Sequence, residues 1–369
     1  MSLRLLAVLA LAQHFEIVSD CGGAEAPPVK DAPARQVVGG GFFGCAVDEG
    51  AVRCWGNNER GQLGRGSTSR QEASGVVTLP EKVAQLALGE ASACARTVTG
   101  GVWCWGDNGT AQLGAPSPAF SAVPLEVKVP VPVAKLALHS DFALALGSDG
   151  RLFGWGNDAE GTLGRDNVDP GSVSPTPVVR AAFTQRFTDI TAGQGNACGL
   201  TPAGELWCWG RVLTAADEGV RTPVKFLDGV SAVVSGAFVA CAIRSGELWC
   251  WGSSPTNDGL TMAWPVPTRL ELGGGSVRQV DSQWFHVCAV TTLDTAWCWG
   301  RGIEGQLGLG GTDPFPTPQL VTAEVESVAT GFFFTCLRRK NGAVACTGAN
   351  EFGQLGLGDS DRRYVPQDQ

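Results

Sequence analysis

The sequence predicts an all-β protein, a closed seven-bladed β-propeller of four-stranded antiparallel blades. The dipeptide Trp-Gly recurs every 42 to 54 residues, and short apolar segments separated by Gly-rich turns fill each interval. Repeats of this period indicate a propeller or a solenoid, and four short strands per repeat are typical of propeller blades. The Trp-Gly pairs start at Trp55, Trp105, Trp155, Trp209, Trp251 and Trp299, and Thr347-Gly348 replaces a seventh.

Each repeat unit has the same order of segments. An apolar first strand such as 83–88 is followed by a second strand containing Cys, and a third strand ends in Cys-Trp-Gly. A polar loop and a Pro-Val segment complete the unit, and proline fits an outermost strand, whose outer edge has no ladder partner. The ring can close in two ways: Tyr364-Val365-Pro366 can form the outer strand of the last blade, or Pro28-Val29 can supply or extend it.

The composition narrows the class of partner. The 369 residues have a formal charge of −9 without a long charge run. Phosphate binding requires a basic surface, so we expect no nucleic-acid partner. No apolar run reaches the roughly 18 residues of a membrane-spanning helix. We expect a monomer with a protein partner.

The N-terminal region divides into two expected segments before the propeller at 36–369. Residues 1–20 contain an apolar stretch that resembles an export signal. Residues 21–35 form a linker rich in Pro, Ala and Gly, and a lipid anchor on Cys21 is an alternative to simple cleavage. A plain N-terminal tail is the third interpretation.

The loop after each Trp-Gly carries a family resemblance. It reads Gly-Asn-Asn-Glu-Arg-Gly-Gln-Leu-Gly at 56–64, and Gln-Leu-Gly recurs at 112–114 and 354–356. This pattern resembles the regulator of chromosome condensation repeat family over about residues 36–369, and the cysteine pairing is similar to that of its secreted bacterial members. The resemblance implies seven blades. Units four and five lack Gln-Leu-Gly, and the family's second-strand histidine survives only as His286, which we interpret as structural.

Thirteen cysteines divide into Cys21 and six pairs spaced 9 or 10 residues apart. Each pair joins an expected second strand to the third, where opposite Cα atoms lie within disulfide range. Unit three has Leu144 and Gly154 instead, so both cysteines are absent together, as expected for bonded partners. A zinc site and a reduced thiol pair are the alternatives. The expected structural disulfides are Cys45–Cys54, Cys94–Cys104, Cys198–Cys208, Cys241–Cys250, Cys288–Cys298 and Cys336–Cys346.

Six disulfides imply an oxidising compartment. We therefore expect an extracytoplasmic protein, whether secreted, periplasmic or attached to the envelope. The tryptophan beside each cysteine points to the opposite side of its strand. Cysteine and tryptophan should thus face different neighbouring blades.

The loop joining the first and second strands of each unit should lie closest to the central channel. Its variable residues are aromatic on units five, six, seven and one, which become contiguous once the ring closes. A contiguous aromatic patch predicts a protein-binding site. Acidic loop residues beside the patch could steer a basic partner toward it. Alternatively, the rings pack beneath the adjacent loops. The candidate binding residues are Phe42, Phe238, Trp284, Phe285, Phe332 and Phe333.

The sequence contains no recognisable catalytic constellation, and we expect no catalytic residues, metal or cofactor. We predict a non-catalytic protein-interaction module, acting as an inhibitor or an adaptor. Two alternatives remain. One is a guanine-nucleotide exchange factor for a small GTPase, as in the family's founding member. The other is an enzyme with a site at the channel mouth.

Overall fold

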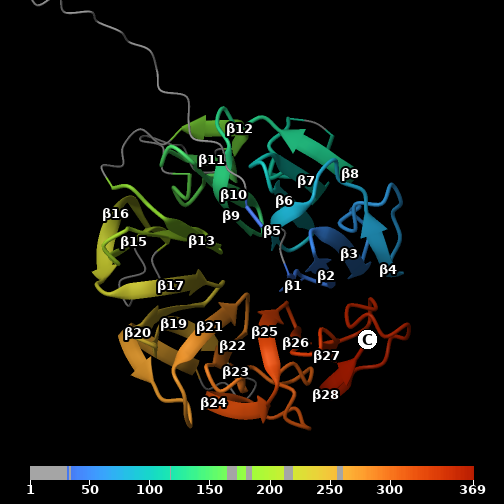
Figure 1. Ribbon diagram of the computed structural model, residues 1–369, viewed down its shortest axis with the longest axis vertical. Coiled ribbons are helices and arrows are strands. Elements are labelled where there is room, and N and C mark those ends of the chain that lie inside the picture. The colour runs from blue at the N-terminus through green and yellow to red at the C-terminus, as the bar shows by residue number, and fades with distance from the viewer. Residues whose placement is uncertain are drawn as a thin grey trace, which may run out of the picture.

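The computed structural model describes residues 31–32, 35–116, 118–163, 173–179, 185–211, 219–255 and 261–369. These residues form seven four-stranded antiparallel sheets arranged radially as a propeller, and they contain no helix (Figure 1). Within each sheet the strands follow one another in chain order from the channel outward. The predicted fold class is confirmed.

The strands of blades 1 to 4 have the following bounds. Blade 1 has β1 (Gln36–Gly39), β2 (Phe43–Asp48), β3 (Ala51–Gly56) and β4 (Glu72–Val77). Blade 2 has β5 (Val83–Leu88), β6 (Ser92–Thr97), β7 (Val102–Asp107) and β8 (Phe120–Val127). Blade 3 has β9 (Val133–His139), β10 (Phe142–Gly147), β11 (Leu152–Asn157) and β12 (Val173–Val179). Blade 4 has β13 (Asp189–Gly193), β14 (Asn196–Leu200), β15 (Leu206–Arg211) and β16 (Gly219–Leu227).

The remaining three blades repeat this order. Blade 5 has β17 (Val230–Ser235), β18 (Val239–Arg244), β19 (Glu247–Pro255) and β20 (Thr261–Leu270). Blade 6 has β21 (Val277–Ser282), β22 (His286–Thr291), β23 (Ala296–Gly300) and β24 (Phe315–Thr322). Blade 7 has β25 (Val325–Thr330), β26 (Phe334–Arg339), β27 (Val344–Gly348) and β28 (Arg363–Asp368).

All six expected cysteine pairs are disulfide-bonded between the second and third strands. Their Cα atoms lie 4.1 to 4.2 Å apart. In blade 3, Leu144 pairs with Gly154 in the same register, so this blade lacks the bridge at the expected place. Five of the six disulfides pack toward the tryptophan of the next blade: Cys45 and Cys54, for example, share a core cluster with Trp105. The bridge of blade 6 faces blade 7, where Thr347 replaces the tryptophan. Side-chain alternation along the strands accounts for this arrangement.

The Gln-Leu-Gly loops connect neighbouring blades. In blade 1, Asn58 Oδ1 accepts a hydrogen bond from the Leu63 backbone N–H at 2.9 Å, which holds the loop in shape. The carbonyl oxygen of Gln62 then accepts a 2.9 Å hydrogen bond from Trp105 Nε1 of blade 2. The Gln-Leu-Gly loops of blades 1, 2 and 7 satisfy the buried indole of the following blade in this way. The blade 6 loop instead accepts a 2.9 Å hydrogen bond from Thr347 Oγ1 at the Gly305 carbonyl. The repeated motif is thus explained by packing.

The ring closes by contacts between side chains and loops of blades 7 and 1. The strand β28 pairs with β27, so Tyr364-Val365-Pro366 forms the outer strand of blade 7; Pro28-Val29 lies outside the described residues. Trp55 Nε1 donates to the Gln354 carbonyl at 2.9 Å. Arg338 of blade 7 contacts Asp48 of blade 1 at 3.1 Å. Closure thus uses the same tryptophan–loop contact that joins other blades.

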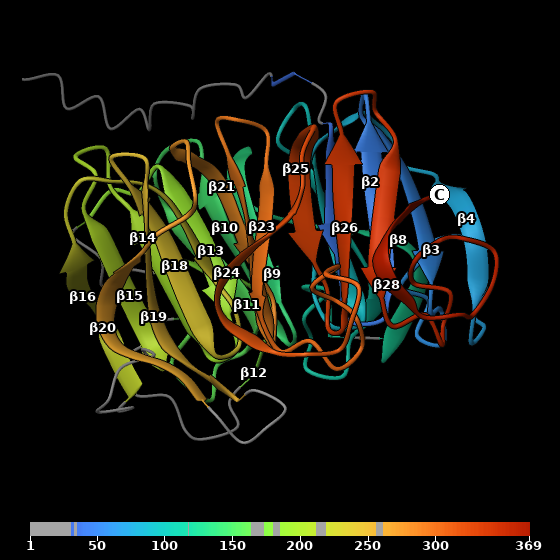
Figure 2. The ribbon, with the colours of Figure 1, turned by 90° about the horizontal axis from the view of Figure 1, so that it is seen from below.

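The two ends of the ring carry different loops (Figure 2). Loops between first and second strands and between third and fourth strands share one end, here called the aromatic face. The chain approaches the propeller on the opposite face, where the Asp31 N–H donates to the Val98 carbonyl at 3.0 Å. Asp31 also forms an ion pair of 2.5 Å with the buried Arg96. The expected signal and most of the expected linker, residues 1–30, lie outside the described residues.

Candidate binding face

The six aromatic residues singled out in the sequence come together on the aromatic face. Trp284 stacks on Phe332 with ring centroids 4.3 Å apart, and Phe42 stacks on the other flank of Phe332 at 5.2 Å. Phe285 and Phe333 are nearly parallel at 5.3 Å. Phe238 completes the group 5.4 Å from Phe285. We call these six residues the aromatic cluster.

The rings of the cluster pack mainly on one another. Phe332, at the centre of the cluster, is 9% exposed, and the other five members are half-buried. Stacked and offset arrangements at these distances stabilise aromatic pairs beyond the area that they bury. The cluster is therefore preorganised, and its outer ring surfaces remain open to solvent.

Four residues that sequence reasoning missed extend this site. Phe352, from a signature loop of blade 7, lies 5.0 Å from Phe42. The guanidinium of Arg70 lies 5.3 Å from the centroid of the Phe352 ring. Arg301 lies 4.9 Å from the centroid of Phe285. His139, from blade 3 across the channel, has its ring 5.7 Å from Trp284.

The channel mouth is bridged by Gln283 of blade 6. Its Nε2 donates to the carbonyl of Gly39 at 3.0 Å and lies 3.3 Å from that of Leu88, so this side chain spans to blades 1 and 2. Just inside lies a cavity of about 170 Å³, lined by the ends of the innermost strands and including His139. Burial lowers the pKa of His139 to about 4. In the other units a glycine stands at the corner where the first strand ends, whereas units three and six have His139 and Gln283 there. These two units thus supply the side chains at the channel mouth.

Carboxylates gather on the blade 2 and blade 3 side of the cluster. The carbonyl oxygen of Glu90 accepts a 3.0 Å hydrogen bond from Gly41, the neighbour of Phe42. Partial burial, with the nearby Asp107 and Asp141 carboxylates, raises the pKa of Glu90. Mutual repulsion of these groups would be relieved by a cation. This side of the face is therefore suited to a basic group.

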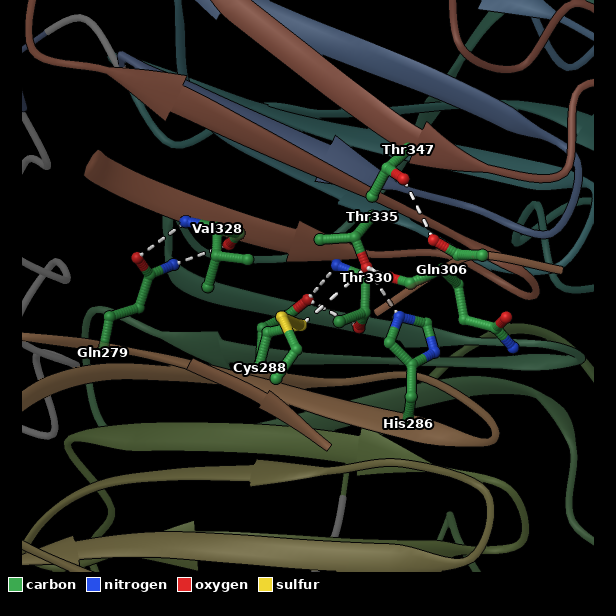
Figure 3. Close-up of a disulfide and its surroundings, with 11 residues drawn as sticks. Gln279, His286, Cys288, Gln306, Val328, Thr330, Thr335 and Thr347 are labelled. Atoms are coloured by element: carbon green, nitrogen blue, oxygen red, sulfur yellow. Dashed lines mark hydrogen bonds between the residues drawn. A yellow bond between two sulfur atoms is a disulfide. The ribbon is translucent and has the colours of Figure 1, made fainter. Parts of the chain in front are cut away.

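The family histidine, His286, connects blades 6 and 7 (Figure 3). Its Nε2 lies 2.8 Å from Thr335 Oγ1, and that hydroxyl donates its only proton to the Gln306 carbonyl at 2.7 Å. The Nε2 atom must therefore be the donor, which leaves Nδ1 unprotonated. Burial lowers the pKa of His286 to about 3, and the side chain is 1% exposed. The structure places His286 between two blades, where it packs as a neutral residue.

Two further features of the described residues bear on the class of site. Within the described parts of the chain, no three His, Cys, Asp or Glu side chains form a group that could hold a metal ion. Among the same residues, no helix is long and apolar enough to cross a membrane. The described residues thus define a seven-bladed β-propeller with an aromatic cluster on one face.

Family models for the "Regulator of chromosome condensation (RCC1) repeat" match residues 49–95, 99–146, 149–200 and 294–337, and also 83–112 and 325–354. These matches cover more than half of the chain. The chain belongs to the RCC1 repeat family.

The E3 ubiquitin-protein ligase HERC2 of Homo sapiens is similar at 27% identity over 168 residues, as is that of Mus musculus. The match covers 39% of this chain, which spans only 3% of either relative. Among solved structures, human WBSCR16 has a TM-score of 0.75 at 21% identity, covering 86% of this chain and 94% of that one. Prp20p of Saccharomyces cerevisiae has a TM-score of 0.74 at 20% identity, covering 91% and 87%. These likenesses show the fold.

Proposed function

We propose that this protein is a non-catalytic, extracytoplasmic interaction module that binds a partner protein on its aromatic face, as an inhibitor or an adaptor. The main support for this proposal is the aromatic cluster. Its large rings are preorganised by stacking, are partly open to solvent and lie at the centre of one face. Preorganised aromatic side chains are the residues that most often dominate binding energy at protein interfaces.

The disulfides support the proposed extracytoplasmic compartment. All twelve bridged cysteines are buried, and disulfides persist in oxidising environments. We propose that residues 1–20 direct export from a bacterial cell and that 21–35 form a linker, with lipid attachment at Cys21 as the alternative to simple cleavage. Intact mass measurement of the mature protein tests this: an unprocessed Met1 terminus on exported protein would contradict it.

Relatives with this architecture support a binding role. One structure of yeast Prp20p is described together with its binding to Gsp1p and histones, and another holds yeast RCC1 (Prp20) bound by Kap60. Nucleotide exchange on a small GTPase is the alternative, and a nucleotide-release assay separates the two. Buried disulfides favour the extracytoplasmic interpretation over a cytoplasmic or nuclear exchange factor.

The binding proposal is tested by capture of partners from the periplasm or culture medium on the immobilised protein. Trp284→Ala and Phe332→Ala should each lose the partner. Leu293→Ala is the matched control, since Leu293 is an exposed apolar residue, 63% accessible, in the β22–β23 turn on the opposite face. Thermal melting verifies that all variants fold. A partner list unchanged by Trp284→Ala and Phe332→Ala would reject the aromatic face as the site.

A further inference from the structure

Arg301 is an arginine with an unusual environment on the aromatic face. It follows β23, and its backbone N–H donates to the Phe285 carbonyl at 3.0 Å. Its guanidinium lies 4.9 Å from the centroid of Phe285 and 5.6 Å from that of Phe333. Arg301 is therefore held against two members of the aromatic cluster.

The charge of Arg301 has no counter-charge among the described residues. No carboxylate of the described residues lies within 4.0 Å of it, and its Nε is buried without a hydrogen-bond partner. By contrast, Arg338 contacts Asp48 at 3.1 Å, and Arg65 contacts Glu72 at 2.6 Å. Arg301 thus combines partial burial, a fixed position and unused donors.

The chemistry of a guanidinium defines what would complete this site. Contact with the ring faces offsets part of the free-energy cost of removing the cation from water. It leaves the planar N–H donors of the guanidinium without acceptors. A carboxylate matches that fork with two parallel hydrogen bonds. A second guanidinium, that of Arg70, lies 5.3 Å from the centroid of Phe352 on the adjoining side of the cluster, and no carboxylate of the described chain pairs with it.

Carboxylates stand on both sides of the aromatic cluster, but those in the loops of blades 6 and 7 are already paired. Glu304 and Glu351 both contact Arg362, Glu351 at 3.2 Å. Around blades 2 and 3, the carboxylates of Asp107 and Asp141 act on Glu90, and Arg60 lies 3.9 Å from Asp107. Arg301 and Arg70 therefore stand beside the rings of blades 6, 7 and 1 without a carboxylate of the described residues to neutralise them, and a bound segment should supply the complementary negative charge.

We propose that the partner docks through an acidic–aromatic segment, in which an Asp or Glu stands next to a large apolar side chain. The apolar side chain packs on the aromatic cluster, and the carboxylate pairs with Arg301. This inference rests on the proposed function, because it names the chemistry of the partner at the same face.

Random linear peptides displayed on phage, selected against the whole folded protein, test this without a known partner. Peptides eluted from the wild type should be enriched in Asp or Glu beside an aromatic or large aliphatic residue. The best peptide is then synthesised with its acidic residue and with the matching amide. Affinities are measured for the wild type, Arg301→Met and Arg301→Glu. Arg339→Met is the control, since Arg339 lies at the opposite end of β26 and pairs with Asp368 at 2.9 Å.

The expected result is a coupled loss. The amide peptide should bind the wild type about tenfold more weakly, and Arg301→Met should bind both peptides equally at that reduced affinity. Arg301→Glu should lose more for the acidic peptide, while Arg339→Met should match the wild type. Increasing salt should weaken only the acidic peptide's binding to the wild type.

Two outcomes would overturn the inference in different ways. Peptides that require Trp284 but show no acidic preference, and bind Arg301→Met as they bind the wild type, would reject the role of Arg301 and leave the aromatic face standing. Selections whose binding survives Trp284→Ala, or that yield no peptide dependent on Trp284, would reject both the inference and the proposed face.

Discussion

Removal of the blade 2 disulfide by the double substitution Cys94→Ala/Cys104→Ala should lower the free energy of unfolding. The bridge closes a loop with a sequence separation of 10 residues, for which the chain-entropy relation gives ~2.7 kcal/mol. Both cysteines are fully buried, so loss of their sulfur atoms adds a packing cost. We expect a total of about 3 to 5 kcal/mol.

Urea unfolding of the oxidised wild type and of the double variant measures this difference. Titration of thiols provides the control, because the twelve bridged cysteines should react only after both denaturation and reduction. Blade 3, with Leu144 opposite Gly154, shows that the register itself does not require a bridge. A difference below about 0.5 kcal/mol, or twelve reactive thiols in the native exported protein, would refute the reasoning.

Two further predictions concern buried polar groups. Trp105→Phe removes the indole donor that bonds the Gln62 carbonyl at 2.9 Å, whereas the buried Nε1 of Trp299 has no hydrogen-bond partner. The loss of unfolding free energy should therefore be about 1 kcal/mol larger for Trp105→Phe than for Trp299→Phe. Equal losses in urea unfolding would contradict the linking role of the loops. His139 and His286 have pKa values lowered by burial to about 4 and about 3, below the unfolded value of about 6.5. The unfolded chain therefore binds more protons in acid, so stability should be fully present above about pH 6.5 and fall as the pH drops toward 3. His286→Gln should make that fall shallower in pH-dependent unfolding, and an unchanged acid limb would argue against it.

The repeated features of the fold could be predicted from the sequence because they recur. Six Trp-Gly pairs and the equivalent Thr347-Gly348 determined the blade count, and the joint absence of Cys at Leu144 and Gly154 identified the disulfide partners. Ring closure could not be derived in this way. Both candidate outer strands had suitable composition, and only the pairing of β28 with β27 decided between them.

The candidate site was predictable in part. Alignment of the repeats placed Trp284 and Phe332 on one face, since equivalent loop positions share a face. It could not find the contacts of Arg301, Arg70 or His139, because these depend on side-chain directions across blades. One signal was available in the sequence. His139 and Gln283 replace the glycine that stands where the first strand ends in the other units, and both lie at the channel mouth.

The entry of the chain on the face opposite the aromatic cluster has a practical consequence. Asp31 is fixed beside Val98, and the last strand also runs toward this end, where the Gln369 N–H donates to the Val344 carbonyl at 2.9 Å. A linkage made at Asp31 or Gln369, such as a surface attachment, would therefore lie on the face opposite the aromatic rings and leave those rings accessible.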